Sequence, residues 1–300
     1  MDNRLTFYEV QRVMTKKLCI YHGNCADGFS AAWAVWKRFP DTDFHAGVYG
    51  QEPPDVTGRE VIIVDFSYKK DVIIELAARA KSILVLDHHK TAQEDIQPLL
   101  DDGTIQGVFD MERSGAMIAW EFFHPEKPVP QLIKHVQDRD LWQFKLGYTK
   151  EIQSAVFSYP YDFETWDWLM SYADDVDGHK ALVSEGRAIT RKHDKDIKEL
   201  LMAAKQKMCI GGHWVWAANL PYTMSSEAGH LLCMEAMYPM GSGELNEYPP
   251  FGATYYDVAD GRIFSLRSVG DFDVSAIAKK YGGGGHKNAA GFKLQNGDTL

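Results

Sequence analysis

The chain has 300 residues, 45% of them hydrophobic and 25% charged, and its 42 acidic residues exceed its 32 basic residues to give a net charge of −10. This is the composition of a globular protein of about two domains, and it excludes a fibrous or wholly disordered chain. Because so acidic a protein repels long polyanions, we expect no long duplex nucleic acid as a partner. Residues 261–300 are the exception, with six basic and three acidic residues.

The cysteines and the distribution of apolar residues indicate the compartment in which the protein is expected. The four cysteines include no CxxC pair, so neither a disulfide scaffold nor a structural zinc module is predicted. Residues 1–16 lack the apolar stretch of a secretory signal. No apolar run approaches the roughly 18 residues of a membrane span. We therefore expect a cytoplasmic protein without a membrane partner.

Short apolar runs alternate with helical patterns in the first half of the chain. The runs that predict strands are residues 18–21, 61–64, 83–86 and 105–109. The patterns that predict helices are residues 31–36, 71–80 and 115–123, the last with Ser114 as its N-cap. Strands that alternate with helices predict a mainly parallel sheet flanked by helices.

A long charged segment leads to a second, smaller α/β region. Residues 176–207 carry Leu, Ile and Ala at helical spacing, which predicts a connecting helix. Later strands are predicted at 213–218, on both sides of the turn at 259–261, and at 289–294, with helices opening at 225 and covering 274–281. The predicted organisation is an α/β N-terminal domain (1–175), a connecting helix (176–207) and a smaller C-terminal α/β domain (208–300).

Acidic residues and histidines follow three of the predicted strands directly. In chain order they are His22 and Asp27, then Asp65, then Asp87, His88 and His89. Parallel sheets bind their ligands beyond the carboxyl ends of the strands. A single Asp at such a position is usually a turn former or a helix cap, so the prediction of a site rests on the coincidence of several.

Carboxylates combined with imidazoles are ligands that suit Mn²⁺ or a similar divalent ion. More of these groups are present than one ion needs while positions stay open for water. Two ions about 3.5–4 Å apart can clamp a phosphoryl group. The sequence therefore predicts a dinuclear metal site at one edge of the sheet.

Several motifs resemble those of the DHH phosphoesterase superfamily. Asp87-His88-His89 resembles the namesake motif. The segment 22–30 resembles the first motif of the family, 64–67 the second and 137–140 the fourth. The tail, with residues 265–268 followed by 282–292, resembles the DHH-associated C-terminal domain. Each motif alone is weak, but together and in this order they are highly specific and span nearly the whole chain.

The resemblance implies a two-lobed enzyme with two Mn²⁺ ions, for which Mg²⁺ or Co²⁺ could substitute. The metal ligands that it implies are His22, Asp27, Asp65, His88 and Asp138, with Asp65 bridging the two ions. His89 would face the substrate phosphate or assist the leaving group. Asp87 would orient a neighbouring imidazole, as carboxylates behind metal ligands do.

Cys25 departs from the family pattern. The first motif usually supplies two carboxylates as Asp-x-Asp, but here Cys25 stands at the first of these positions and Asp27 at the second. A thiol is a poor match for a hard ion. The first metal site is therefore weakened, altered with help from Asn24 or water, or rebuilt around the thiolate. A packed Cys25 that binds nothing is an equal alternative.

The glycine-rich tail is the expected substrate-binding region. Four consecutive glycines let backbone N–H groups converge on an anion, and a guanidinium and an imidazole lie near them in the sequence. The residues expected to bind substrate are Arg267, Gly283, Gly284, Gly285 and His286. By resemblance, this loop binds the phosphate or sugar at the far end of the substrate.

These features predict a Mn²⁺-dependent phosphoesterase whose partner is a small phosphate-bearing substrate, in the first instance a short oligonucleotide hydrolysed to nucleoside monophosphates. Alternatives within the same class are a cyclic-dinucleotide or 3′-phosphoadenosine-type phosphatase, a polyphosphatase and a processive single-strand exonuclease, the last disfavoured by the acidic charge. A non-catalytic nucleotide-binding module, in which Cys25 marks the loss of catalysis, is the alternative from another class. The oligomeric state is left open.

Overall fold

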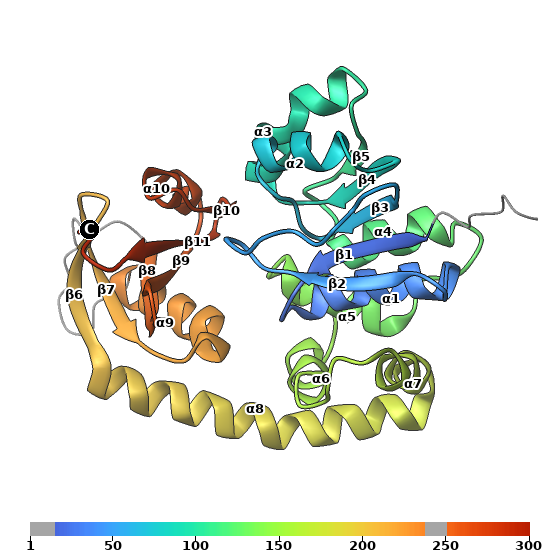
Figure 1. Cartoon of the computed structure of the whole chain (residues 1–300). Helices are drawn as coiled ribbons and strands as arrows, with labels where there is room; N and C mark the ends of the chain where they lie inside the picture. Colours follow the sequence, from blue (N-terminus) through green and yellow to red (C-terminus); the bar gives the residue numbers. More distant parts are fainter. Residues whose placement is uncertain (1–15, 238–250) are drawn as a thin grey trace, which may run out of the picture. The chain divides into compact units, whose positions relative to one another are not determined.

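The computed structural model describes residues 16–237 and 251–300, and the chain divides into two compact units (Figure 1). The first unit comprises residues 1–88 and 95–182, and the second comprises 89–94 and 183–300. The later division falls inside the long helix α8 (Val176–Ala204). Residues 1–15, on which the expectation about a secretory signal rests, lie outside the described residues.

The first unit is built on a five-stranded sheet in which all neighbouring strands are parallel, in the order β2-β1-β3-β4-β5. Its strands are β1 (Lys17–His22), β2 (Asp43–Gly47), β3 (Glu60–Val64), β4 (Ser82–Asp87) and β5 (Gln106–Phe109). The central strand β3 is an apolar run buried on both faces, as expected of a parallel sheet covered on both sides. The prediction of a parallel sheet flanked by helices is confirmed. Edge strand β2 was not predicted, because its sequence DFHAG contains no apolar run.

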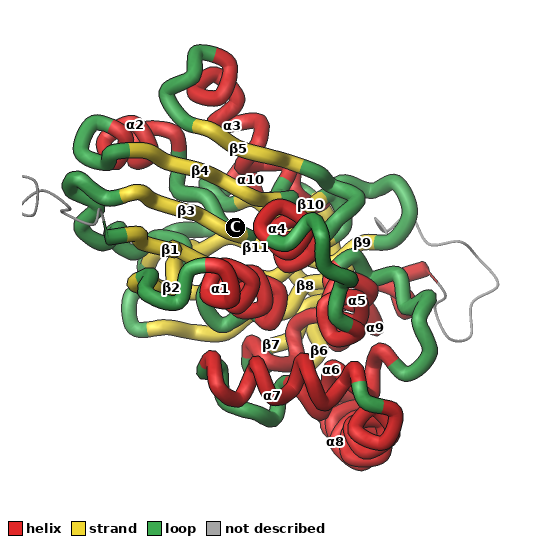
Figure 2. The backbone as a smooth tube through the Cα atoms, turned by 90° about the vertical axis from the view of Figure 1, so that its right-hand side faces the viewer, coloured by secondary structure: helices red, strands yellow, loops and turns green. Residues whose placement is uncertain are grey.

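Helices cover both faces of this sheet (Figures 1 and 2). Those nearest to it are α1 (Ala26–Arg38), α2 (Lys70–Ala77), α3 (Lys90–Asp101) and α4 (Gly115–Phe123). Helix α2 and the later turns of α3 bury Ile73, Leu76 and Ile96 against one face. Helices α1 and α4 lie on the other face. Ser114 caps α4 as predicted, since its hydroxyl accepts a hydrogen bond from Met117 N at 3.3 Å.

Three further helices complete the first unit: α5 (Gln131–Asp140), α6 (Thr149–Val156) and α7 (Phe163–Asp174). Trp166 of α7 is fully buried. Its indole packs edge-on against Phe29, with 5.1 Å between ring centroids, and donates a hydrogen bond of 3.0 Å to Ser30 Oγ. Because both partners lie in the first turns of α1, helix α7 fixes the helix that carries the first motif.

The second unit contains a mixed six-stranded sheet in the order β10-β11-β9-β8-β7-β6. Its strands are β6 (Lys205–Ile210), β7 (His213–Asn219), β8 (Phe251–Val258), β9 (Gly261–Ser268), β10 (Gly284–His286) and β11 (Ala289–Gln295). Its helices are the one-turn η1 (Tyr222–Met224), α9 (Ser225–Met237) and α10 (Val274–Lys280). The smaller C-terminal α/β domain is thereby confirmed, and β8 and β9 form the predicted hairpin.

Helix α8 ends at Ala204, earlier than the predicted end at residue 207. Residues 205–207 instead begin β6, because their backbone pairs with residues 216–218 of β7. The sequence pattern missed this switch, since the alternating Lys residues suit an exposed strand as well as a helix face. None of the helices described for this chain is long and apolar enough to cross a membrane.

Candidate metal centre

Three neighbouring parallel strands of the first unit bring the predicted residues to one edge of its sheet. His22 is the last residue of β1, Asp65 follows β3, and Asp87 ends β4 immediately before His88. Asp65 N still donates to Leu86 O at 2.9 Å, so the ladder between β3 and β4 continues into the site. The backbone at Asp65 then turns through a φ of 53°, a left-handed conformation that ordinary residues adopt rarely.

One group of donors surrounds the imidazole of His88, which is 1% exposed. Its Nε2 atom lies 3.1 Å from Asp65 Oδ1, 3.4 Å from Asp140 Oδ2 and 3.7 Å from Asp27 Oδ2. One ligand atom each from Asp27, His88 and Asp140 lies within 4.8 Å of the others. These residues therefore form a carboxylate–imidazole set of the kind that binds hard divalent ions.

A second group lies on the other side of Asp65. The Oδ2 atom of Asp65 is 3.4 Å from His22 Nδ1, and one ligand atom each from His22, Cys25 and Asp65 lies within 4.8 Å of the others. Asp65 thus directs Oδ1 to His88 and Oδ2 to His22. A carboxylate in this position is suited to be shared by two ions.

The electrostatics of the centre favour a bound cation. Burial, together with the nearby carboxylates of Asp65 and Asp140, raises the pKa of Asp27 well above its usual range. Burial opposes ionisation of Asp65 as well, but the imidazoles of His22 and His88 hold the pKa of Asp65 well below its usual range. Carboxylates crowded in a buried site need compensating positive charge, which a divalent cation supplies. The donor set therefore fits a divalent metal ion.

The N-terminus of α4 holds two of these carboxylates in place. Asp27 accepts hydrogen bonds from Gly115 N at 2.7 Å and Ala116 N at 3.0 Å, where the helix dipole favours an anion. At Gly115 a side chain would begin only 2.4 Å from Asp65 Cβ. Glycine is required there because the helix end lies directly against Asp65. The sequence indicated Gly115 only as part of a helix start that could contact phosphate, since its closeness to Asp65 arises from a contact between distant segments.

The acidic pair of the fourth motif divides between two roles. The Asp138 carboxylate accepts hydrogen bonds from Lys145 N at 2.8 Å, Leu146 N at 3.0 Å and Thr149 Oγ1 at 2.6 Å. The structure thus places Asp140, rather than Asp138, against His88. Two positions two residues apart lie on opposite sides of a helix, so only one of them can face the centre. Recognising 131–140 as a helix would have shown from the sequence that only one of the two faces the centre, but not which one.

Of the two residues expected to assist catalysis, Asp87 is fully buried and accepts a hydrogen bond of 2.7 Å from the backbone N–H of His88. His89 belongs to the second unit with residues 90–94. Its ring stacks on that of His286, with 4.5 Å between centroids. The structure therefore brings His89 together with one of the predicted substrate-binding residues.

The other predicted substrate-binding residues lie in the same part of the second unit. Arg267 of β9 pairs with Ala289 of β11, which in turn pairs with His286 of β10, so the three share one row and one face of the sheet. The Arg267 guanidinium donates a hydrogen bond of 2.9 Å to Ser226 Oγ. Arg267 and His286 thus lie in one row across the sheet, with Ala289 between them.

The glycine run is a close-packed part of the fold. A side chain at Gly283 would begin 2.1 Å from Gly291 O, and one at Gly285, whose φ is 135°, would begin 2.5 Å from Ala289 O. The backbone of Gly284 and Gly285 pairs with β11 as strand β10. These glycines are therefore needed for the hairpin itself, whatever they bind.

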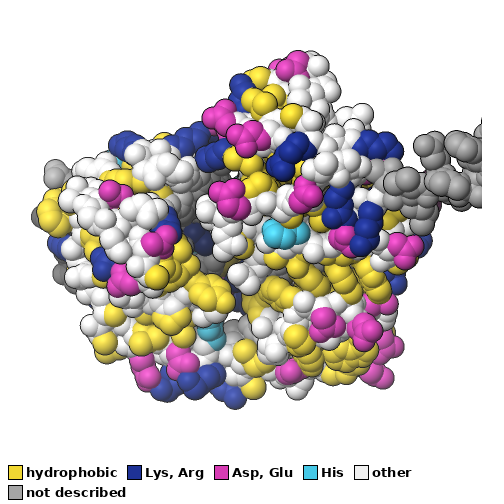
Figure 3. All heavy atoms as spheres, in the orientation of Figure 1, with side chains coloured by type: hydrophobic (Ala, Val, Ile, Leu, Met, Phe, Trp, Pro, Cys, Tyr) yellow, Lys and Arg dark blue, Asp and Glu magenta, His cyan; other side chains and the backbone are white. Residues whose placement is uncertain are grey.

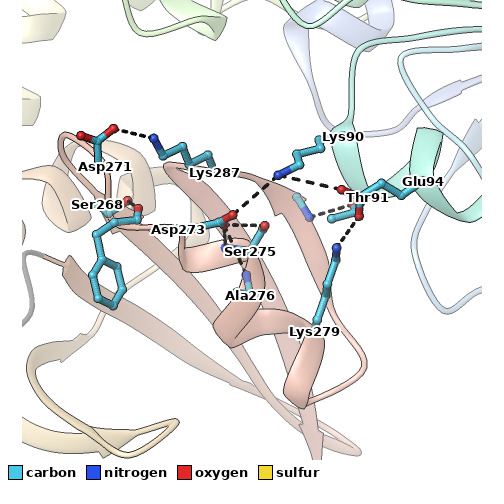
Figure 4. A network of polar contacts seen from close by, with 12 residues as sticks. Lys90, Thr91, Glu94, Ser268, Asp271, Asp273, Ser275, Ala276, Lys279 and Lys287 are labelled. Atoms are coloured by element: carbon cyan, nitrogen blue, oxygen red, sulfur yellow. Dashed lines mark hydrogen bonds and ion pairs between the residues drawn. The ribbon is translucent and has the colours of Figure 1, made fainter.

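Polar contacts within the second unit hold residues 89–94 beside the hairpin (Figure 4). Gly285 N donates to Thr91 Oγ1 at 3.1 Å, and Lys279 Nζ donates to Glu94 Oε2 at 2.5 Å. Lys90 Nζ lies 3.8 Å from Asp273, whose carboxylate caps α10. The segment after the DHH tripeptide is thereby tied to the glycine-rich hairpin.

Residues 251–300, which contain this hairpin, match the family model of the DHHA1 domain. The match agrees with the expected resemblance of the tail to the DHH-associated C-terminal domain. Within the first unit, segments 22–30, 64–67 and 137–140, which resemble DHH motifs, contribute donors to the metal centre together with His88.

Similar proteins were found both by sequence and by structure. The chain is 31% identical over 295 residues to the uncharacterized protein R106 of Acanthamoeba polyphaga mimivirus, with 91% of this chain and 66% of that relative covered. The chain thus spans just under two thirds of the relative's length.

The comparison with solved structures matched the two proteins that follow, among others. A pGpG-specific phosphodiesterase from Vibrio cholerae gives a TM-score of 0.46 at 17% identity, with 94% of each chain covered. RecJ from Thermus thermophilus, in complex with Mn²⁺, gives a TM-score of 0.47 at 15% identity, with 94% of this chain and 50% of RecJ covered.

Proposed function

We propose that this chain is a Mn²⁺-dependent phosphoesterase that hydrolyses short nucleotidic substrates, in the first instance short oligonucleotides to nucleoside monophosphates. The observation that carries the proposal is the position of Asp65, which directs one oxygen to each of two donor groups. Such a shared carboxylate is the feature that a two-ion phosphoesterase requires.

The residues of the first unit would hold and orient the ions. Asp27, His88 and Asp140 offer the harder donor group, to which we assign Mn²⁺. The bound ions would supply Lewis-acid stabilisation of charge on a phosphoryl group and lower the pKa of water. The backbone N–H groups of Gly115 and Ala116 keep Asp27 oriented, so the donors are positioned before a substrate arrives.

The residues of the second unit would bind the substrate. Arg267 and His286 share one face of the sheet, and both suit an anionic group. We assign to this row the phosphate or sugar of a short substrate and to His89, stacked on His286, a contact with the same substrate. The first unit then carries the chemistry, and the second selects what is hydrolysed.

Surface charge supports a short substrate. On each unit, acidic side chains are scattered among basic ones over the face seen in Figure 3. The net charge of −10 therefore opposes binding of a long polyanion, whereas a substrate of a few nucleotides interacts mainly with the site itself.

A substrate panel with Mn²⁺ tests the proposal. The panel contains dinucleotides, oligonucleotides of increasing length, a cyclic dinucleotide, 3′-phosphoadenosine phosphate and polyphosphate. We expect the highest kcat/KM with the shortest linear oligonucleotides. A preference for strands longer than about ten nucleotides would contradict the choice of substrate, since long strands multiply phosphate contacts with an acidic protein. Binding of nucleotides without hydrolysis of any member would instead identify a non-catalytic module.

A further inference from the structure

We propose that His22, Cys25 and Asp65 form a thiolate-containing site for a thiophilic divalent ion of the Zn²⁺ and Co²⁺ class. The inference deepens the proposed function and rests on it, because Asp65 is the carboxylate shared with the harder donor group. The centre would then hold two different ions, one bound through sulfur and one through oxygen and nitrogen only.

The first turn of α1 brings the thiol to the imidazole. Cys25 is the N-cap residue of α1, and Phe29 N donates to Cys25 O at 2.9 Å, which fixes the Cys25 backbone. At Gly28 a side chain would begin 2.3 Å from His22 O and 2.7 Å from His22 Cβ. The helix therefore lies directly against the last residue of β1. This contact is what sets Cys25 beside His22.

The three side chains converge. One ligand atom each from His22, Cys25 and Asp65 lies within 4.8 Å of the others, and Asp65 Oδ2 is 3.4 Å from His22 Nδ1. The Cys25 side chain makes no capping hydrogen bond with α1, although serine or aspartate at an N-cap usually does. The sulfur is thus directed to the donor group and not to the helix end.

The chemistry of the three donors differs from that of the neighbouring group. Thiolate sulfur selects Zn²⁺ and related ions over Mn²⁺ and Mg²⁺, and imidazole suits the same ions. Three protein ligands of the Cys, His and Asp types, with one position left for water or substrate, are the composition of catalytic zinc sites. The neighbouring set of Asp27, His88 and Asp140 contains no sulfur and keeps the preference for a harder ion.

The surroundings of Cys25 differ from those of the cysteines that only fill space. Cys19 and Cys233 are fully buried, and Cys19 lies in the apolar run of β1. Cys25 is half-buried and lies against a histidine and a carboxylate. A thiol in this environment is placed as a ligand, whereas Cys19 and Cys233 behave as small hydrophobic residues.

Titration of the metal-free full-length chain with Co²⁺ alone, under argon and with a non-thiol reductant, tests the site. We expect a near-ultraviolet thiolate-to-cobalt charge-transfer band that saturates at one equivalent. Cys25→Ser should abolish the band and weaken Zn²⁺ binding by at least the roughly tenfold that loss of even a partner of a metal ligand causes. Serine is favoured at N-caps, so the fold should be retained, which circular dichroism checks.

Two further variants complete the experiment. Cys209→Ser, at an exposed cysteine of β6, is the matched control and should keep the band. Cys25→Asp should abolish the band and increase affinity for Mn²⁺, measured by electron paramagnetic resonance of free Mn²⁺. The proposal is overturned if wild-type protein binds Co²⁺ without the band, or if Cys25→Ser keeps it.

The charge-transfer band tests the thiolate site, and hydrolysis tests the proposed function, so the two can fail independently. If wild-type protein shows the band but hydrolyses no phosphoester, the thiolate site is supported and the proposed function is refuted. Mn²⁺-dependent hydrolysis by a protein that shows no band would retain the function and reject the thiolate site.

Discussion

Gly115 lies so close to Asp65 that an added Cβ would fall 2.4 Å from Asp65 Cβ and 2.8 Å from its Oδ1. We therefore predict that Gly115→Ala displaces Asp65 and lowers metal-dependent hydrolysis more than tenfold. The fold should be destabilised by about 1–3 kcal/mol, the usual cost of overpacking. Gly147→Ala is the control, because no atom lies within 4 Å of that position. Equal activity of the two variants would contradict the close contact.

Asp65→Asn and His88→Ala should each abolish Mn²⁺-dependent hydrolysis, because both remove a donor at the point where the two groups meet. Each should also lose the rise in melting temperature that a ligand of the native state produces. Far-ultraviolet circular dichroism should remain that of wild-type protein. A purified Asp65→Asn protein that keeps full turnover would refute the assignment of the centre.

We expect substitution of Asp140 to weaken metal binding and substitution of Asp138 to lower stability. Asp140→Asn removes a donor that faces His88, so we expect weaker Mn²⁺ binding with little change in stability. Asp138→Asn disturbs hydrogen bonds from Lys145, Leu146 and Thr149, each to a charged acceptor. Its expected cost is about 1–3 kcal/mol in the free energy of unfolding. Chemical denaturation and metal titration of both variants test this, and the reverse pattern would assign Asp138 to the metal.

Because His135 is buried, we predict that the free energy of unfolding decreases in acid. Burial and the nearby His179 lower the pKa of His135 from its usual 6.5 to about 4. The unfolded chain therefore takes up a proton as pH falls below about 6.5, whereas the folded chain stays neutral until about 4. The contribution of neutral His135 to the free energy of unfolding is complete above pH 6.5 and declines towards pH 4. The decline is at most about 3 kcal/mol, since one pKa unit corresponds to 1.36 kcal/mol.

Urea denaturation at pH 7 and pH 4.5, with a chelator present, measures this decline. His135→Asn should show a smaller decline than wild-type protein. Asparagine retains an N–H donor that can replace His135 Nδ1 opposite Thr149 Oγ1, which lies 2.9 Å from Nδ1 in wild-type protein. The same pH dependence in both proteins would show that other groups are responsible.

The elements that position the site could be predicted from the sequence wherever the pattern of a short segment alone indicates a strand or a helix. Strands β3 and β4 are β-branched or apolar runs; Asp65 directly follows β3, and Asp87 ends β4. Because parallel strands align their carboxyl ends, the convergence of His22, Asp65 and His88 followed from the strand pattern alone. Ser114 was predictable for the same reason, since a helix cap depends on its immediate neighbours.

The remaining features depend on contacts that no short segment records. Helix α3 contains Pro98 and a polar first turn, and it is held partly by contacts of Thr91 and Glu94 in the second unit. The choice between Asp138 and Asp140 depends on the rotation of α5 against the sheet. The requirement for glycine at position 115 comes from Asp65, fifty residues away in the sequence.

At position 65, the backbone conformation and metal binding favour different residues. The Asp65 φ of 53° lies in the left-handed region, which glycine adopts without penalty and which aspartate tolerates better than most L-residues but not freely. Selection for heat resistance alone would therefore favour Asp65→Gly, which relieves the backbone and removes the shared carboxylate. A library of this protein screened for stability needs a parallel measurement of metal binding, or its best-folded members will include those that no longer bind the ions.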